Sequence, residues 1–284
     1  MRTLKTTFLL TALTLLLLFI GNAFGGRAGL TIALGGAILM NGIAYFFSDK
    51  IALKSSGAVP ISREQSPRLY KVMEQLAAKA NLPVPKLYLI PQAAPNAFAT
   101  GRNPRHASVA VTQGLMELMN DDELEGVIAH ELSHVRNYDI LTSSIAATVA
   151  GAVTWLAYMG RWAALFGGFG GGGDGDSEGG WAAILMLILA PFAAMLLQLG
   201  ISRQREYQAD ASGAKMVGHP NGLISALEKL GSYNKRIPMN ISPSTSSLCI
   251  VQPLAGGQML SKLFSTHPPL SDRIARLRSM TITR

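Results

Sequence analysis

The stretch His130-Glu131-Leu132-Ser133-His134 decides the fold of the region around it. Residues four positions apart lie on one face of an α-helix, with Cβ atoms about 5–6 Å apart, so the two imidazoles can bind one zinc ion. Glu131 lies about 100° further round the helix and can reach a water molecule at such a site without binding the metal itself. The pattern therefore predicts a helix that carries the zinc site of a metal-dependent hydrolase.

The residues before this stretch predict where its helix begins. Asp121, Asp122 and Glu123 supply capping groups and negative charge suited to a helix N-terminus. Apolar residues then follow at helical spacing as far as Leu132. We therefore expect the two histidines to lie inside a helix, about two turns after its start.

The distribution of apolar residues favours a membrane protein. The chain has 284 residues, 49% of them hydrophobic. Four nearly uncharged stretches approach the roughly 20 residues that a helix needs to cross a bilayer. They are Thr6–Phe24, Ala28–Phe47, Leu141–Gly160, which is the most polar, and Trp181–Ile201. Too little polar chain remains to cover four such helices in a soluble core, so we expect four transmembrane helices packed through small residues.

The first apolar stretch has an alternative interpretation as a cleaved signal peptide. Arg2 and Lys5 precede it, and Ala23-Phe24-Gly25 offers small residues at cleavage spacing. However, the stretch is long for a signal peptide, and a second apolar stretch follows after a very short loop. An uncleaved helical hairpin is the expectation.

Charges beside the apolar stretches predict the orientation of the chain. Basic residues lie where each hairpin begins or ends, whereas the loop within the second hairpin is acidic. The basic residues are Arg2, Lys5, Lys50, Lys54, Arg203 and Arg205, and the acidic ones are Asp174, Asp176 and Glu178, with Arg27 and Arg161 as exceptions. The positive-inside rule then places both termini and residues 48–140 on the cytoplasmic side.

Cysteine content and net charge limit the partners. Cys249 is the single cysteine, so an internal disulfide is excluded; it fits a reducing compartment and we interpret it as a packing residue. Of the net charge of +8, most lies in residues 201–284, which favours contact with anionic lipid headgroups of the bilayer. No nucleic-acid-binding motif accompanies this charge, so we expect no nucleic-acid partner.

The remaining sequence predicts an α+β catalytic domain interrupted by the second hairpin. Its predicted helices are Ser66–Ala80, Leu223–Leu230 and Asp272–Met280, and its predicted strands are Lys86–Ile90, Asn96–Gly101 and Ser108–Thr112. A small sheet beside the metal helix would offer an edge for an extended peptide. The expected division is a membrane hairpin at 1–48, catalytic parts at 49–140 and 202–284, and a second hairpin at 141–201 with a Gly-rich loop at 167–180.

Glu206 is the expected third metal ligand. The third apolar stretch begins directly after the histidine helix and the fourth ends directly before Glu206, so a membrane hairpin returns Glu206 to the face where His134 lies. Asp210, one helical turn later, can accept the N–H of a metal-binding imidazole and fix its tautomer. The alternative interpretation of this acidic pair is a solvated helix face.

Together these motifs resemble the HtpX-type heat-shock membrane metalloproteases, in the gluzincin family that includes the CAAX prenyl-protease. The resemblance rests on His130–His134, on Glu206-Tyr207-Gln208-Ala209-Asp210, on Asn96-Ala97-Phe98-Ala99 and on the two hairpins. It implies a zincin-like domain with one Zn²⁺ per chain, in a multi-pass protein of the bacterial cytoplasmic (inner) membrane with its active site facing the cytoplasm. The implied substrates are damaged or misfolded membrane proteins, cleaved in quality control and the stress response.

The resemblance also implies roles for individual residues. Glu131 would act as the general base, and Asn96, Ala97, Phe98 and Ala99 would align the peptide substrate. His267, within Thr266-His267-Pro268, would be a donor to the transition state, although a residue at the start of a helix explains it equally well. A non-catalytic membrane scaffold with a structural zinc is the alternative function. A transporter is disfavoured, because the four stretches contain no internal Asp, Glu, Lys or His.

Overall fold

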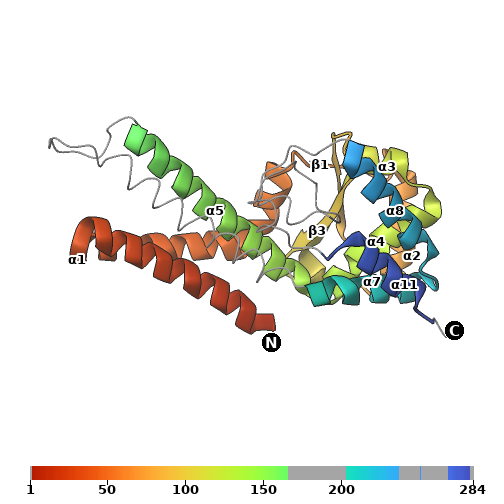
Figure 1. The fold of residues 1–284 in the computed structure, drawn as a ribbon, viewed down its shortest axis with the longest axis horizontal. Helices are drawn as coiled ribbons and strands as arrows, with labels where there is room; N and C mark the ends of the chain where they lie inside the picture. The colour runs from red at the N-terminus through yellow and green to blue at the C-terminus, as the bar shows by residue number, and fades with distance from the viewer. Residues whose placement is uncertain (1, 166–202, 237–249, 251–267, 282–284) are drawn as a thin grey trace.

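The computed structural model describes residues 2–165, 203–236, 250 and 268–281. Two regions are visible in Figure 1. The long helices α1 and α5 extend to one side. On the other side, a sheet and the remaining helices form the region that corresponds to the predicted catalytic domain, the catalytic body. The N-terminus lies beside the junction of the two regions rather than at the far tip of the helices.

The helix α1 (Arg2–Ser55) is a hairpin folded back at Gly26. Gly26 has φ 51° and ψ −137°, a conformation that only glycine adopts without strain. The arms Leu4–Asn22 and Gly25–Ser55 are each long and apolar enough to cross a membrane. The expected helical hairpin is therefore present. Its second arm continues beyond Phe47 because Ala52 and Leu53 pack against the sheet.

The helix α5 (Asp139–Leu165) packs along this hairpin. Ile145, Val149 and Val153 lie against Leu9 and Leu13 of α1. Large apolar side chains of α1 face outward instead, with Ile32 76% and Phe19 72% exposed, so the two arms fit insertion into a membrane. Among the residues whose side chains are described, these two arms are the helices both long and apolar enough to cross a membrane, and α5 contributes the shorter apolar segment Asp139–Val153. The predicted fourth stretch Trp181–Ile201 and the loop 167–180 lie outside the described residues.

A four-stranded mixed sheet organises the catalytic body. The strand order is β1-β2-β4-β3, in which β2 and β4 are parallel and the other two pairs are antiparallel. The three predicted strands are confirmed to within one residue, and a fourth, two-residue strand was not predicted. The strands are β1 (Val59–Pro60), β2 (Lys86–Ile90), β3 (Ala97–Gly101) and β4 (Ala107–Thr112). Among the described strands, β3 is an edge strand that pairs with β4 alone.

Helices cover both faces of this sheet. One face packs against α2 and α4, through Leu76, Ile128 and Leu132 around Val109. The other face carries Phe98 and meets the end of α1. The helices of the body are α2 (Pro67–Lys79), α3 (Gln113–Leu118), α4 (Asp121–Arg136), α7 (Arg203–Val217), α8 (Asn221–Arg236) and α11 (Leu270–Arg278), with a 3₁₀ turn at Pro104–His106.

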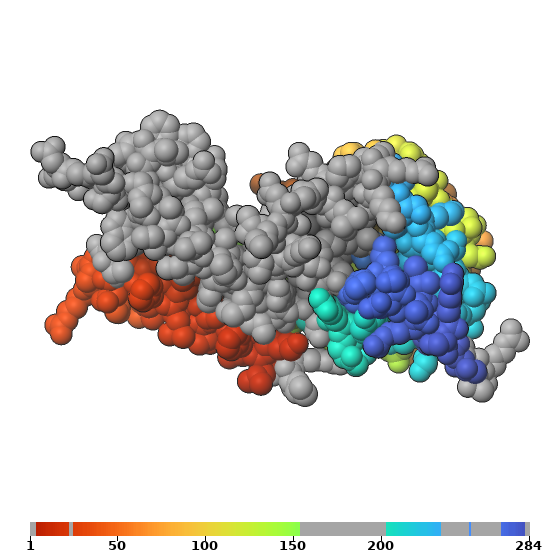
Figure 2. All heavy atoms as spheres, viewed as in Figure 1, coloured from red at the N-terminus to blue at the C-terminus, as the bar shows by residue number. Residues whose placement is uncertain are grey.

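The helix α4 is the central element of the body. It is buried along most of its length and packs against α2, α7, α8 and β3. On the side shown in Figure 2, α11 lies against α7 and α8. The predicted helix at 223–230 is longer than expected, and the last predicted helix begins two residues earlier, at Leu270, directly after Pro269.

Candidate metal centre

The sequence of α4 fixes both histidines inside the body. Its first turn is closed by a capping box, in which Asn120 accepts from the Glu123 N–H and Glu123 accepts from the Asn120 N–H. Gly213 of α7 lies directly against α4, since a Cβ there would be 3.0 Å from the backbone nitrogen of His130. Two helices distant in sequence therefore approach closely at His130.

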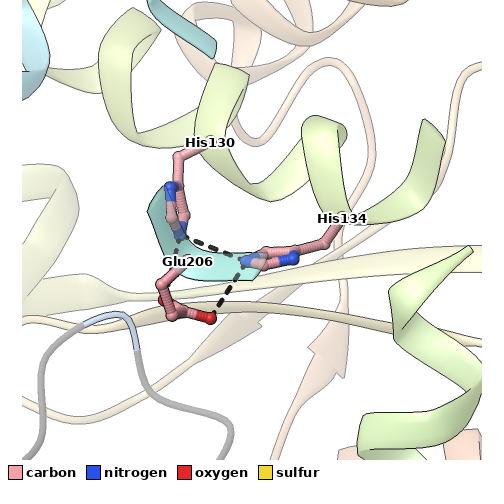
Figure 3. A group of neighbouring side chains, drawn as sticks. All are labelled: His130, His134 and Glu206. Atoms are coloured by element: carbon pink, nitrogen blue, oxygen red, sulfur yellow. Dashed lines mark hydrogen bonds and ion pairs between the residues drawn. The ribbon is translucent and has the colours of Figure 1, made fainter. Parts of the chain in front are cut away.

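His130, His134 and Glu206 point toward one another, as Figure 3 shows. The two imidazole Nε2 atoms are 3.3 Å apart, and the Glu206 carboxylate oxygens lie 3.7 Å from His130 Nε2 and 3.5 Å from His134 Nε2. All three ligand atoms lie within 4.8 Å of one another. Tetrahedral zinc with bonds of about 2.0–2.1 Å separates its ligands by roughly 3.3 Å. The donor types and spacing thus fit a divalent metal, zinc in particular.

The far nitrogen of His130 is held by a buried ion pair. Its Nδ1 lies 2.9 Å from Asp210 Oδ1, and Asp210 accepts two hydrogen bonds from Arg273, of 2.6 and 2.8 Å. Arg273 is fully buried and also donates to the Ile250 carbonyl at 2.8 Å. Asp210 therefore stands where the sequence predicted an acceptor for a metal-binding imidazole, and this contact directs His130 Nε2 toward Glu206.

The far nitrogen of His134 is held differently. Its Nδ1 lies 3.3 Å from Asp139 Oδ2, at the first residue of α5. The other Asp139 oxygen lies 3.4 Å from Nη1 of Arg205, the residue before Glu206. This support comes from the junction with the long helices, whereas that of His130 comes from inside the catalytic body.

The pKa values of the polypeptide alone follow from these contacts. Burial lowers the pKa of His130, so its imidazole is neutral at pH 7, as a metal ligand must be. Burial also disfavours the charged form of His134, but Asp139 and Glu206 outweigh it and raise the pKa of His134 to about 9. Burial would raise the pKa of Asp210, yet Arg273 holds it at about 2, so Asp210 stays ionised.

Glu131 lies between the metal ligands and the edge strand. Burial raises its pKa to about 8, with Glu206 adding to the rise, while His134 and a backbone hydrogen bond from Ala99 of β3 oppose it. In the metal-free polypeptide this carboxyl group is therefore mainly protonated at pH 7, and it exchanges its proton close to neutral pH.

The strand β3 presents backbone groups to this side. The Asn96 carbonyl accepts from the Thr112 N–H, so alternation along an antiparallel pair directs the even-numbered residues toward β4. The backbone groups of Ala97 and Ala99 therefore point to the free edge. Of the four predicted residues Asn96, Ala97, Phe98 and Ala99, Ala99 contacts Glu131, whereas the side chain of Phe98 packs against the end of α1 on the other face of the sheet. His267 and Cys249 lie outside the described residues.

The sequence analysis missed Asp139, Arg205 and Arg273 as parts of the centre. An isolated acid at the start of an uncharged stretch is unusual, and this signal could have pointed to Asp139. Arg205 was considered only as one of the charges that predict the orientation of the chain in the membrane. Arg273 carried no signal, because its helix also contains the exposed Arg276 and Arg278 and looks like a solvated basic surface.

This fold and this group of side chains define a metallopeptidase: a helix with His-Glu-x-x-His, a third carboxylate from a second helix and an edge strand alongside. Residues 63–281 match Peptidase family M48. The chain belongs to this family, and it is accordingly a metalloprotease whose family implies a divalent metal.

Similar proteins agree with this assignment. The chain is 57% identical over 274 residues to a protein named Protease HtpX homolog from Desulfatibacillum aliphaticivorans, covering 96% of this chain and 88% of that one. It is 51% identical to the Protease HtpX homolog of Syntrophotalea carbinolica over 99% of this chain and all of that one. The crystal structure of S. mikatae Ste24p shares the fold, with a TM-score of 0.50 and 22% identity over 93% of this chain; the chain spans 61% of that protein.

Proposed function

We propose that the chain is a zinc endopeptidase of the bacterial cytoplasmic membrane. It would cleave damaged or misfolded membrane proteins on the cytosolic side, in quality control and the stress response. The convergence of His130, His134 and Glu206 within 4.8 Å, beside a buried Glu131, carries the proposal. The family makes the chain a protease; the identity of the metal, the side of the membrane and the substrates are the parts proposed here.

Zinc would be held by His130, His134 and Glu206. When bound, it supplies Lewis-acid chemistry that polarises the scissile carbonyl and favours attack by water. Glu131 takes the proton of the attacking water and passes it to the leaving amine. Asp210 holds His130 in the tautomer that keeps Nε2 free for the metal, since its contact is with Nδ1. If His267 lies near the scissile bond, it donates to the transition state.

The edge of β3 would bind the peptide. An extended polypeptide can pair with the outward backbone groups of Ala97 and Ala99, as in other strand additions. The Ala99 N–H interacts with Glu131 in the free protein, so a bound peptide would lie directly beside the general base. Such pairing recognises the peptide through hydrogen bonds to its backbone rather than through its side chains. This suits an enzyme that cleaves damaged proteins of many sequences.

The proposed membrane arrangement has four spans. The hairpin 1–48 and the hairpin 141–201 cross the bilayer, and residues 49–140 and 202–284 form one cytosolic catalytic domain. The two apolar arms of α1 and the basic residues at the outer ends of the hairpins support it. An engineered thiol at the exposed position 63 (Arg63→Cys in a Cys249→Ser background) should label in inverted membrane vesicles and not in intact cells. The opposite pattern would overturn the orientation.

The decisive experiment separates metal binding from catalysis. Protein purified in detergent should contain one zinc per chain by mass spectrometry and digest casein, and a chelator should stop the digestion. Glu131→Gln should keep its zinc and lose more than 99% of the cleavage rate, because the proton acceptor is gone. Glu125→Gln, a change on the surface side of the same helix, should cleave normally.

Retained cleavage in Glu131→Gln would remove this residue from the base role. Intact zinc content in a purified wild-type protein that cleaves neither casein nor a membrane-protein substrate would favour the alternative of a non-catalytic scaffold with structural zinc. A structural site normally has a fourth protein ligand, and the described residues bring only three together.

A further inference from the structure

We propose that Arg205 and Lys5 form a binding site for a phosphate group at the junction of α1, α5 and α7, occupied by the headgroup of an anionic phospholipid. The site lies behind the three proposed metal ligands, where Arg205 contacts the Asp139 that supports His134. The choice of a phospholipid rests on the proposed cytosolic orientation, whereas the phosphate chemistry rests on the side chains alone.

One edge of the Arg205 guanidinium contacts Asp139, and the other edge has no hydrogen-bond acceptor among the described residues. Nη1 lies 3.4 Å from Asp139 Oδ1. Nε and Nη2 are buried, and neither has a hydrogen-bond partner in the structure described. These two N–H groups lie along the same edge of the guanidinium, which is the edge that grips two oxygens of a phosphate or carboxylate at once. A buried charged donor without an acceptor is costly, so an oxygen ligand on this edge would remove that cost.

Lys5 brings a second positive charge to the same place. It lies close enough to Arg205 and Asp139 to interact electrostatically with both. A contact of 3.3 Å between the Thr6 and Thr142 hydroxyls holds this part of α1 against the first turn of α5, where Asp139 lies. Two cations therefore share one carboxylate, that of Asp139, which also contacts His134. The group carries a net positive charge, which an anion would neutralise.

The position of the site identifies the source of that anion. The first turn of α1, the start of α5 and the start of α7 meet at the boundary between the long helices and the catalytic body (Figure 1). In the proposed orientation this is the headgroup layer of the cytosolic leaflet, which is rich in phosphate. A peptide substrate does not fit, because Asp139 meets Nδ1 of His134, on the side away from Glu206, so Arg205 lies behind the imidazole.

The site would also connect the bilayer to the metal. A phosphate on the free edge of Arg205 fixes the guanidinium, which orients Asp139 and, through it, His134. Phospholipid binding should therefore tighten zinc binding by a factor of a few. This readout does not depend on proteolysis.

The test measures lipid binding to delipidated, zinc-loaded full-length protein in a neutral detergent. Short-chain phosphatidylglycerol is titrated and followed by native mass spectrometry and by the shift in Tm, with short-chain phosphatidylcholine and inorganic phosphate as comparison ligands. We expect one phosphatidylglycerol per chain, bound at least tenfold more tightly than phosphatidylcholine. Arg205→Gln and Lys5→Gln should each weaken it at least tenfold, and Arg205→Lys, which keeps the charge and loses the two-pronged edge, should weaken it less.

Arg203→Gln is the matched control, because Arg203 is exposed on the same helix and should bind the lipid as wild type does. Lys5 lies outside the catalytic body. If Arg205→Gln does not fold, Lys5→Gln still tests the site. Equal binding by wild type, Arg205→Gln and Lys5→Gln would overturn the site. If inorganic phosphate saturates the same site with the affinity of phosphatidylglycerol, the phosphate site stands, but the proposal that a phospholipid occupies it is overturned. Lipid binding does not require catalysis, so failure here is distinguishable from failure of the proposed protease function.

Discussion

The two histidines of α4 have the same proposed task, which is to bind the metal, and very different surroundings. His130 is 1% exposed and is supported by Asp210 and Arg273 through contacts of 2.6 to 2.9 Å. The side chain of His134 is 16% exposed, and its support through Asp139 and Arg205 has contacts of 3.3 and 3.4 Å. One support is a short, buried ion pair and the other a looser one at the junction with the long helices.

The difference in contact length indicates that the support of His130 is rigid and that the support of His134 can adjust. Short hydrogen bonds between buried ions are strong, and breaking one leaves an uncompensated charge inside the protein. Longer contacts between charged groups are weaker and cost less to break and reform. We therefore infer that the His130 side fixes the metal centre within the catalytic body, and that the His134 side responds to the position of α5.

Loss of Arg273 tests the rigid side and should have the largest effect. Arg273→Gln leaves Asp210 buried without its partner, so the free energy of unfolding should fall by about 3–5 kcal/mol. The Kd for zinc should rise by roughly 10- to 100-fold, because the acceptor of His130 is no longer held in place. Chelator competition and thermal unfolding measure the two quantities.

Arg276→Gln is the control for this variant. Arg276 lies one turn along the same helix, is exposed and stacks on Tyr207 at 3.8 Å. It should leave zinc affinity unchanged. A zinc Kd for Arg273→Gln within twofold of wild type would show that the buried pair does not support the metal.

Glu123 tests whether rigidity in α4 matters to the metal at all. It is buried, closes the capping box and accepts from Lys229 at 2.7 Å and Ser225 at 2.6 Å. Burial opposes its ionised form, but the hydrogen bonds from Lys229, Ser225 and Asn120 prevail and lower its pKa below 4.5. Glu123→Gln should lower the free energy of unfolding at pH 7 by about 1–3 kcal/mol.

The pH dependence of this loss has a definite sign. The folded pKa of Glu123 is below the unfolded value of 4.5, so its contribution is present above pH 4.5 and disappears as the pH falls through the folded pKa. The difference between wild type and Glu123→Gln should therefore shrink below pH 4.5. Zinc affinity should not change. A weakened metal site in this variant would mean that general loosening of α4, rather than direct contact, governs the two histidines.

Local elements were predictable where local sequence determines them. The strand Lys86–Ile90 is a short apolar and aromatic run between prolines, and the structure has it at those residues. The helix with His130 and His134 begins at the acidic residues that the sequence provides as its first turn. Glu206 was predictable on the hypothesis that residues 141–201 form a membrane hairpin, because a hairpin returns the chain to the side from which it left.

Supports that depend on packing between distant segments were not predictable. Arg273 reaches Asp210 because α11 packs on α7, and nothing in the sequence near either residue encodes that contact. Asp139 and Arg205 meet because α7 begins beside α5. Hydrophobic periodicity specifies which face of a helix is buried, but not which charged residue of another helix will lie opposite.

Loss of Asp139 tests the adjustable side and should have a smaller effect than loss of Arg273. Asp139→Asn keeps the size of the side chain and removes the charge that orients His134. The zinc Kd should rise by no more than about tenfold, the lower end of the range for such supports, because the contact with His134 is longer than that between Asp210 and His130. The free energy of unfolding should fall by about 1–2 kcal/mol, because His134 and Arg205 lose an ionised acceptor that they contact only at 3.3 and 3.4 Å.

The comparison fails if Asp139→Asn weakens zinc binding more than Arg273→Gln does. Both variants should be measured in the same detergent and at the same pH. Asp272→Asn, an exposed acid of α11, is the control and should match wild type.

Ser144 tests whether α5 also holds the edge strand, with the smallest expected effect. Its hydroxyl lies 2.7 Å from that of Thr100 at the end of β3, and both residues are buried. Ser144→Ala removes one hydrogen bond, so it should cost about 1 kcal/mol of stability. If β3 aligns the peptide, KM should rise by up to fivefold, while kcat and the zinc Kd remain unchanged because the metal ligands are untouched.

Thr148→Ala separates this contact from a general effect on α5. Thr148 lies one turn further along and donates only to the Ser144 carbonyl of its own helix. It should leave KM unchanged. An equal rise in KM for both variants would mean that β3 responds to the stability of α5 as a whole; a fall in zinc affinity with Ser144→Ala would mean that α5 reaches the metal through β3 as well as through Asp139, and the two sides of the centre would then not be independent.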